Sequence, residues 1–75
     1  MEKLRAKYEE LALEIRFIDK MLEDIKDDIY YYKMTNNDYL HGAELTYNKY
    51  KQRKKDTVKK FDIICEAMKI VEQGF

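Results

Sequence analysis

The chain has no proline, no serine and no tryptophan, and only two glycines, one cysteine and one histidine among its 75 residues. Without proline or a glycine-rich stretch, nothing in the composition breaks a long helix or marks a flexible linker. One cysteine cannot form an internal disulfide, and one cysteine with one histidine falls short of the four ligands of a structural zinc site. The cross-links that commonly stabilise small domains are therefore excluded within one chain.

Side chains for nucleophilic catalysis are equally scarce. His41 and Cys65 lie about 36 Å apart if one helix joins them at 1.5 Å per residue, and Gly42 and Gly74 begin no phosphate-binding GxGxxG or GxxxxGK run. The carboxylates of Glu23, Asp24, Asp27 and Asp28 have no histidine or EF-hand loop beside them, and we interpret them as a solvated helix face. We therefore expect no enzyme, no catalytic residue, no metal site and no cofactor.

Long hydrophobic runs are also missing. No apolar stretch approaches 18 residues, and the first residues do not resemble a secretory leader with a cleavage site. Together with the lone thiol, this favours a reducing compartment without membrane attachment. We expect a cytoplasmic protein.

A 4-3 spacing of apolar residues fills most of the chain and predicts its architecture. All nine positions of a first seam are apolar or tyrosine, as are eight of ten in a second. The first comprises Leu4, Tyr8, Leu11, Ile15, Ile18, Leu22, Ile25, Ile29 and Tyr32; the second comprises Leu40, Ala43, Tyr47, Tyr50, Lys54, Thr57, Phe61, Ile64, Met68 and Val71. The fold class is all-α, with two long antiparallel helices forming one coiled-coil-like hairpin domain over residues 1–75.

The turn is expected at about residues 34–36, between helices at about 2–33 and 37–73. Thr35 could cap the second helix while Asp38, three residues on, completes a capping box. An alternative places the loop at residues 35–42. Gly42 would otherwise lie inside the second helix, where close approach of another backbone could justify it, and Gly74 fits a carboxy-terminal cap.

Two polar residues, Lys54 and Thr57, interrupt the second seam. Pairing about the turn places Thr57 near Ile18 and Lys54 near Leu22. Such residues can fix the register of a coiled coil, or a lysine can extend its ammonium group out of the seam. A basic pocket within the seam is the alternative interpretation.

A second apolar stripe lies behind the seam on each helix. Its residues are Leu13, Phe17 and Met21 on the first helix and Ile63, Ala67 and Ile70 on the second. A monomer would expose them, and contiguous exposed apolar surface usually marks an interface. We expect a homo-oligomer, a four-helix bundle or larger, formed through Leu13, Phe17, Met21, Ile63 and Ile70.

Charge is balanced overall, with 15 basic and 15 acidic residues, but it is unevenly distributed. Residues 1–28 carry a net charge of −3 and residues 49–60 a net charge of +6. Six of the seven tyrosines lie near the turn or beside this basic run. The candidate partner- or ligand-binding residues are Tyr30, Tyr31, Lys33, Tyr39, Tyr47, Lys51, Lys54 and Lys55.

Three functions are compatible with this cluster. The first is a non-enzymatic interaction protein, an inhibitor or adaptor of phage or mobile-element type that binds a host protein through tyrosine and lysine. The second is an oligomeric binder of an anionic ligand, such as a nucleotide, cyclic nucleotide or nucleic acid, because aromatic rings stack on bases and lysines neutralise phosphates. The third is a structural coiled-coil component.

Overall fold

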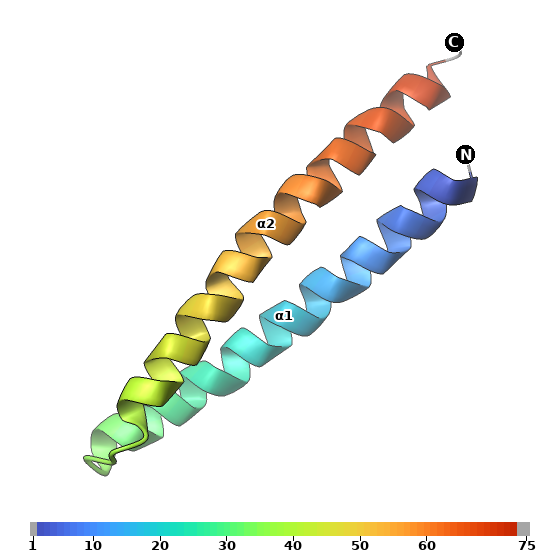
Figure 1. Ribbon diagram of the computed structural model, residues 1–75. Helices are drawn as coiled ribbons and strands as arrows, with labels where there is room; N and C mark the ends of the chain where they lie inside the picture. Colours follow the sequence, from blue (N-terminus) through green and yellow to red (C-terminus); the bar gives the residue numbers. More distant parts are fainter. Residues whose placement is uncertain (1, 74–75) are drawn as a thin grey trace.

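Two long helices form the protein, and the computed structural model describes residues 2–73. Helix α1 spans Glu2–Met34 and helix α2 spans Leu40–Glu72, with 33 residues each. They run antiparallel side by side, with both chain ends at one end of the rod (Figure 1). The rod extends 59 × 14 × 14 Å. The predicted all-α helical hairpin is confirmed.

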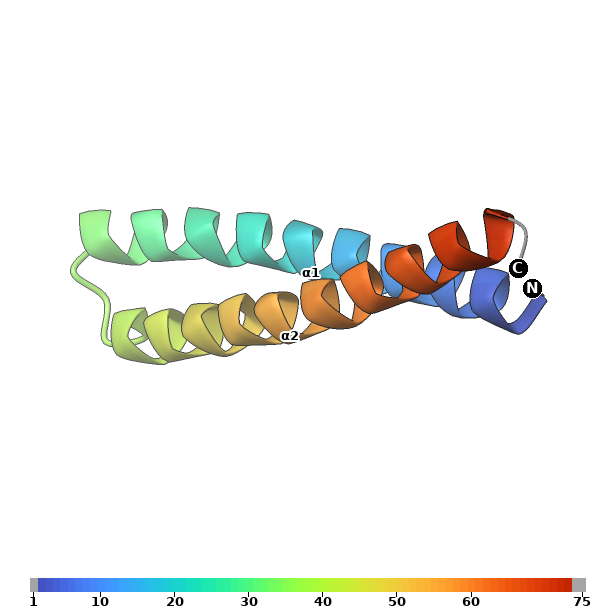
Figure 2. The same ribbon diagram turned by 90° about the horizontal axis from the view of Figure 1, so that it is seen from above.

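The helices wind about each other, as a heptad-like seam requires. Their turn ends overlap in the view of Figure 1, whereas their terminal ends overlap in the perpendicular view of Figure 2. The acidic Glu2 lies in the first turn of α1 and the basic Lys33 in its last, so both charges oppose the helix dipole. Neither helix within residues 2–73 is long and apolar enough to cross a membrane.

The core of the single chain is thin. Within residues 2–73, the buried side chains are Leu11, Ile18, Ile25 and Thr57, which are 2%, 0%, 8% and 5% exposed. All four are seam positions, and most of the other seam residues are half-buried, although Tyr8 and Val71 are exposed. Near the open end, the rings of Tyr8 and Phe61 pack with centroids 4.9 Å apart. The 4-3 spacing of apolar residues therefore predicted the face by which the two helices contact each other.

Lys54 shows how a charged residue occupies the seam. It is only half-buried, and its ammonium Nζ lies 2.6 Å from Asp19 Oδ1 on the facing helix. The apolar stem can thus cover the seam while the charge reaches its edge. Thr57 is the polar residue that stays inside. Of the two predicted roles of Lys54, extension out of the seam matches this geometry.

The turn is longer than predicted and is closed differently. Asn36 has φ 51°, and the Asn37 N–H donates to Tyr32 O at 2.9 Å while the Asn36 N–H donates to Lys33 O at 3.4 Å. This is a Schellman motif, in which a left-handed residue ends the helix and satisfies its last carbonyls. Asparagine tolerates this conformation better than most residues.

The predicted Thr35 cap of the second helix is therefore wrong. The Thr35 hydroxyl donates to Tyr31 O at 3.0 Å, so it serves the end of α1. The residue before α2 is Tyr39, which makes no side-chain cap, and Asn37 Oδ1 accepts the Tyr39 N–H at 2.9 Å instead. The linker covers residues 35–39, longer than the predicted 34–36 and shorter than the alternative 35–42. The predicted cap at Gly74 lies outside the described residues.

Candidate binding site at the turn end

The tyrosines near the turn form a short aromatic row. Tyr31 and Tyr32 on α1 have ring centroids 5.9 Å apart, and Tyr32 and Tyr39 have centroids 6.1 Å apart. Tyr31 and Tyr39 are exposed and Tyr32 is half-buried. Tyr39 lies in the linker directly before α2, so the row bridges the two helices. The turn thus brings together two of the predicted binding residues, Tyr31 and Tyr39.

The other predicted binding residues do not join this row. Lys51 lies over the ring of Tyr47, 5.9 Å from its centroid, in a cation–π arrangement on α2. Tyr30, Lys33 and Lys55 are exposed. These contacts therefore divide the predicted cluster into an aromatic row at the turn and a Tyr47–Lys51 pair farther along α2.

The basic run of α2, residues 49–60, forms two ion pairs with α1. Arg53 Nη2 and Nε donate to Glu14 Oε1 at 2.9 and 3.3 Å, and Lys54 contacts Asp19 as described above. Two of the seven basic side chains in residues 49–60 are thus paired with carboxylates of α1. Lys54, a predicted binding residue, is already engaged within the chain.

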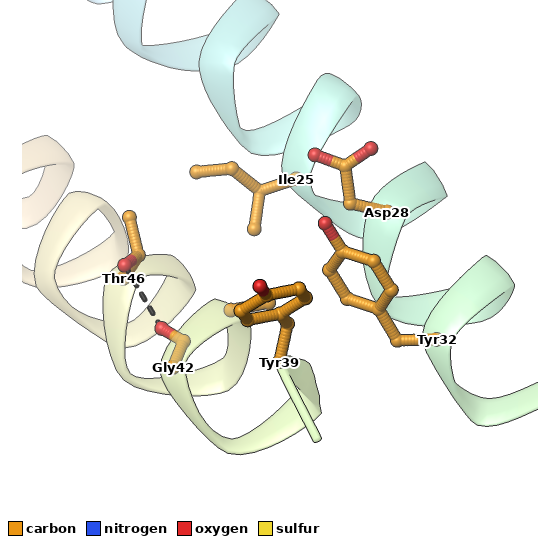
Figure 3. A pocket seen from close by; sticks show the side chains of 7 residues that line it. Ile25, Asp28, Tyr32, Tyr39, Gly42 and Thr46 are labelled. Carbon is orange, nitrogen blue, oxygen red and sulfur yellow. Dashed lines mark hydrogen bonds between the residues drawn. The ribbon is translucent and has the colours of Figure 1, made fainter. Parts of the chain in front are cut away.

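A groove opens beside the aromatic row, between the two helices. It has a volume of about 390 Å³ and is lined by Ile25, Asp28, Tyr32, Tyr39, Gly42, Ala43 and Thr46. Figure 3 shows these side chains converging from α1 and α2, with the Thr46 hydroxyl donating to Gly42 O at 2.9 Å. We call this the Asp28–Gly42 groove.

Gly42 gives the groove an open side. A Cβ built on Gly42 would meet nothing within 4 Å. The close approach of another backbone, which could have justified this glycine, is therefore not made within residues 2–73. Gly42 is the third residue of α2, where glycine is unfavourable by up to about 1 kcal/mol relative to alanine. No packing contact within residues 2–73 offsets this cost.

Most residues of this groove were not among the sequence candidates. Asp28 was assigned to a solvated acidic face, and Ile25 to the seam. The sequence held one indication of this groove, because Asp28 and Tyr32 are four residues apart and so share one helix face. What placed Gly42 and Thr46 opposite them was the register of the hairpin.

The second apolar stripe is largely uncovered. Leu13, Phe17, Ile63 and Ile70 are exposed, whereas Met21 is half-buried. Arg16 and Leu13 border a shallow hollow with Tyr8, Glu9 and Ala12. The predicted interface residues thus remain solvent-facing in the single chain, apart from Met21.

No group of three His, Cys, Asp or Glu side chains within residues 2–73 is arranged to hold a metal ion. Cys65 is half-buried, and His41 is exposed at the opposite end of α2. Comparison with family models, with curated proteins and with solved structures returned no match. The function is therefore inferred from the surface of the hairpin itself.

Proposed function

We propose that the protein is a non-enzymatic interaction module that self-associates through its second apolar stripe and binds another protein through its tyrosine-rich turn end. Self-association is supported most directly by how few apolar residues are buried compared with how many large ones are exposed. Three apolar residues are buried in the described chain, while eleven large hydrophobic residues are exposed. Such a surface is typical of a subunit rather than of a free monomer.

The exposed area supports a second copy of this chain as the covering partner. A folded monomer of 9.2 kDa exposes about 4,900 Å², whereas this chain exposes 6245 Å². The excess is roughly 1,300 Å² per chain, so two chains could cover about 2,600 Å², within the range of obligate homodimers. Two hairpins packed in this way make a four-helix bundle.

The turn end suits a protein partner better than an anionic ligand. Tyr30, Tyr31 and Tyr39 are exposed there, and tyrosine is enriched in protein interfaces because it adds large contact area at little entropic cost. The anionic-ligand alternative depends on the basic run, but Arg53 and Lys54 of that run are paired with carboxylates of α1. Binding of a host protein by a phage or mobile-element inhibitor stays a prediction.

Native mass spectrometry of the purified protein tests self-association. We expect a dimer or larger species for the wild type and a monomer for Phe17→Asp and Ile63→Asp. Leu45→Asp is the matched control, since Leu45 and Phe17 are both 51% exposed but Leu45 lies outside the stripe. Circular dichroism would establish that the variants remain helical. A monomeric wild type would refute self-association.

The protein-binding part needs a separate experiment. A partner recovered with the wild-type protein should bind it directly when both are purified, and Tyr31→Ala with Tyr39→Ala should weaken that complex at least tenfold, as for interface anchors. Leu45→Ala should leave it unchanged. If the tyrosine variants bind as well as the wild type, the turn end is not the docking surface.

A further inference from the structure

The Asp28–Gly42 groove carries a single acidic side chain among aromatic and apolar neighbours. We propose that it binds a basic side chain, arginine or lysine, of the protein partner. This inference deepens the proposed function, because it assigns a chemistry to the residue that the partner inserts at the turn end.

The charge of Asp28 is available for such a contact. The ion pairs formed within residues 2–73 engage Glu10, Glu14 and Asp19, and none includes Asp28. On its own helix, the positions four residues away are Asp24 and Tyr32, neither of which is basic. Opposite it, Thr46 donates its hydroxyl to Gly42 O. The nearest basic residues of α2 beyond Thr46 are Lys49 and Arg53, which line a neighbouring hollow with Tyr50, and Arg53 is paired with Glu14.

The other residues that line the groove suit a basic side chain, which joins a cationic group to an apolar stem. Tyr32 and Tyr39 present aromatic rings whose centroids are 6.1 Å apart, and ring faces attract ammonium and guanidinium groups. Ile25 and Ala43 add apolar surface for the methylenes that lysine and arginine bury along a contact. Figure 3 shows Asp28, Tyr32 and Tyr39 around the same opening. An acidic side chain would instead meet the Asp28 carboxylate and be repelled.

Gly42 explains how a partner could reach this site. Because a Cβ at position 42 would meet open space, the α2 side of the groove has no side chain in the way. A partner backbone or a long side chain can approach the helix closely there, as glycine permits elsewhere in proteins. The glycine that has no packing role inside the hairpin thus gains one in the complex.

A small probe tests the chemistry without knowledge of the partner. Acetyl-arginine amide is titrated into the isotope-labelled full chain, and the backbone amide signals of Asp28, Gly42 and Thr46 are followed by NMR. We expect saturable shifts at these positions, and smaller ones with the neutral acetyl-citrulline amide. Equal shifts with acetyl-glutamate amide would overturn the proposal.

Two variants separate the groove from general charge effects. Asp28→Asn should weaken acetyl-arginine amide binding roughly tenfold, because charged hydrogen bonds are about twice as strong as neutral ones. Asp24→Asn removes the same charge one turn away and should leave binding unchanged. Equal weakening by both substitutions would reduce the effect to the overall field of α1 and refute the site.

A third variant tests the steric role of Gly42. Gly42→Leu should reduce binding while raising helix stability, since leucine is a better helix former than glycine. Binding lost in a more stable protein cannot be attributed to unfolding; retained binding would contradict the assigned path of approach. The acetyl-arginine amide titration and the native mass test separate proposals. Arginine binding by a monomer would refute self-association alone. A dimer that binds no arginine would refute the groove alone.

Discussion

At the scale of single residues, the hairpin depends on very few side chains. Ile18 is the one large side chain within residues 2–73 that is fully buried, and Leu11 and Ile25 are the other buried apolar residues. Each of these lies on the seam of α1, so α1 supplies three of the four buried residues, and α2 contributes Thr57 and half-buried residues. Because so little is buried, each of these positions should matter more than in a larger core.

We expect Ile18→Ala to destabilise the fold by about 2–5 kcal/mol, the usual cost of truncating a buried isoleucine. That loss is comparable to the whole stability of a small domain. Urea unfolding followed by circular dichroism measures it, with Leu45→Ala at an exposed position as the control. Similar effects of the two substitutions would contradict the assigned core.

Gly42→Ala should have the opposite sign. Beyond its own helix backbone, the added methyl group meets no atom within 4 Å, so the variant keeps the native contacts and should gain about 0.4–1 kcal/mol of stability. An increase in the urea midpoint would confirm that Gly42 has no internal packing role. A decrease that grows with protein concentration would instead place Gly42 against a second copy of the chain.

At the scale of elements, the turn is the least regular part of the described chain. Asn36 alone among its non-glycine residues has a positive φ, and the Schellman hydrogen bonds around it end α1. The five-residue linker in which Asn36 lies, residues 35–39, fixes how α2 returns along α1. The turn thus sets the register that brings the groove residues of the two helices together.

Substitution of Asn36 tests this role of the turn. Asn36→Gly should be tolerated or slightly stabilising, because glycine adopts positive φ without steric cost. Asn36→Val should destabilise the hairpin by about 1–2 kcal/mol, since β-branched residues are strained in this region. Thermal unfolding of the two variants at equal concentration compares them. Equal stability would mean that the turn does not require a left-handed residue.

Charge is also organised at this scale. The ion pairs Glu14–Arg53 and Asp19–Lys54 join α1 and α2 at partly exposed positions. Exposed pairs contribute little to stability, typically between zero and about 1 kcal/mol. Their clearer effect is on the relative direction of the two helices. The antiparallel arrangement is the one that places Glu14 and Asp19 of α1 beside Arg53 and Lys54 of α2.

At the scale of the whole molecule, one hairpin leaves many large apolar side chains exposed. A rod of 59 × 14 × 14 Å has too little interior to cover Phe17, Ile63 and Ile70 as well as its seam. Burial of these residues would require contact with another chain. A second hairpin would provide that contact with the same sequence and without any new type of interaction.

If the native state is such an oligomer, its thermal stability must depend on concentration, because association stabilises only the folded chains. We expect the Tm to rise as the protein concentration is increased over two orders of magnitude. Phe17→Asp should lower the Tm and abolish this dependence. A wild-type Tm that is independent of concentration would show that the uncovered stripe does not drive association.

The sequence by itself determined the helical hairpin and its contact face. The 4-3 spacing is local information, because 3.6 residues per turn place those positions on one side of a helix whatever follows later. It therefore identified Leu11, Ile18 and Ile25 as core and Lys54 as a seam residue. The composition likewise indicated two helices joined by a short connection.

Only the tertiary structure decided the details of the turn and of the site. Thr35 can serve either helix by its local hydrogen bonds, and the backbone at Asn36 settled that it ends α1. The Asp28–Gly42 groove arises between residues on opposite sides of the turn, and their pairing depends on the linker length and the coiling of the helices. Local periodicity carries no information about which residues of the two helices lie opposite each other. The acidic residues 1–28 and the basic residues 49–60 therefore looked unrelated in the sequence, and only the fold pairs Glu14 with Arg53 and Asp19 with Lys54.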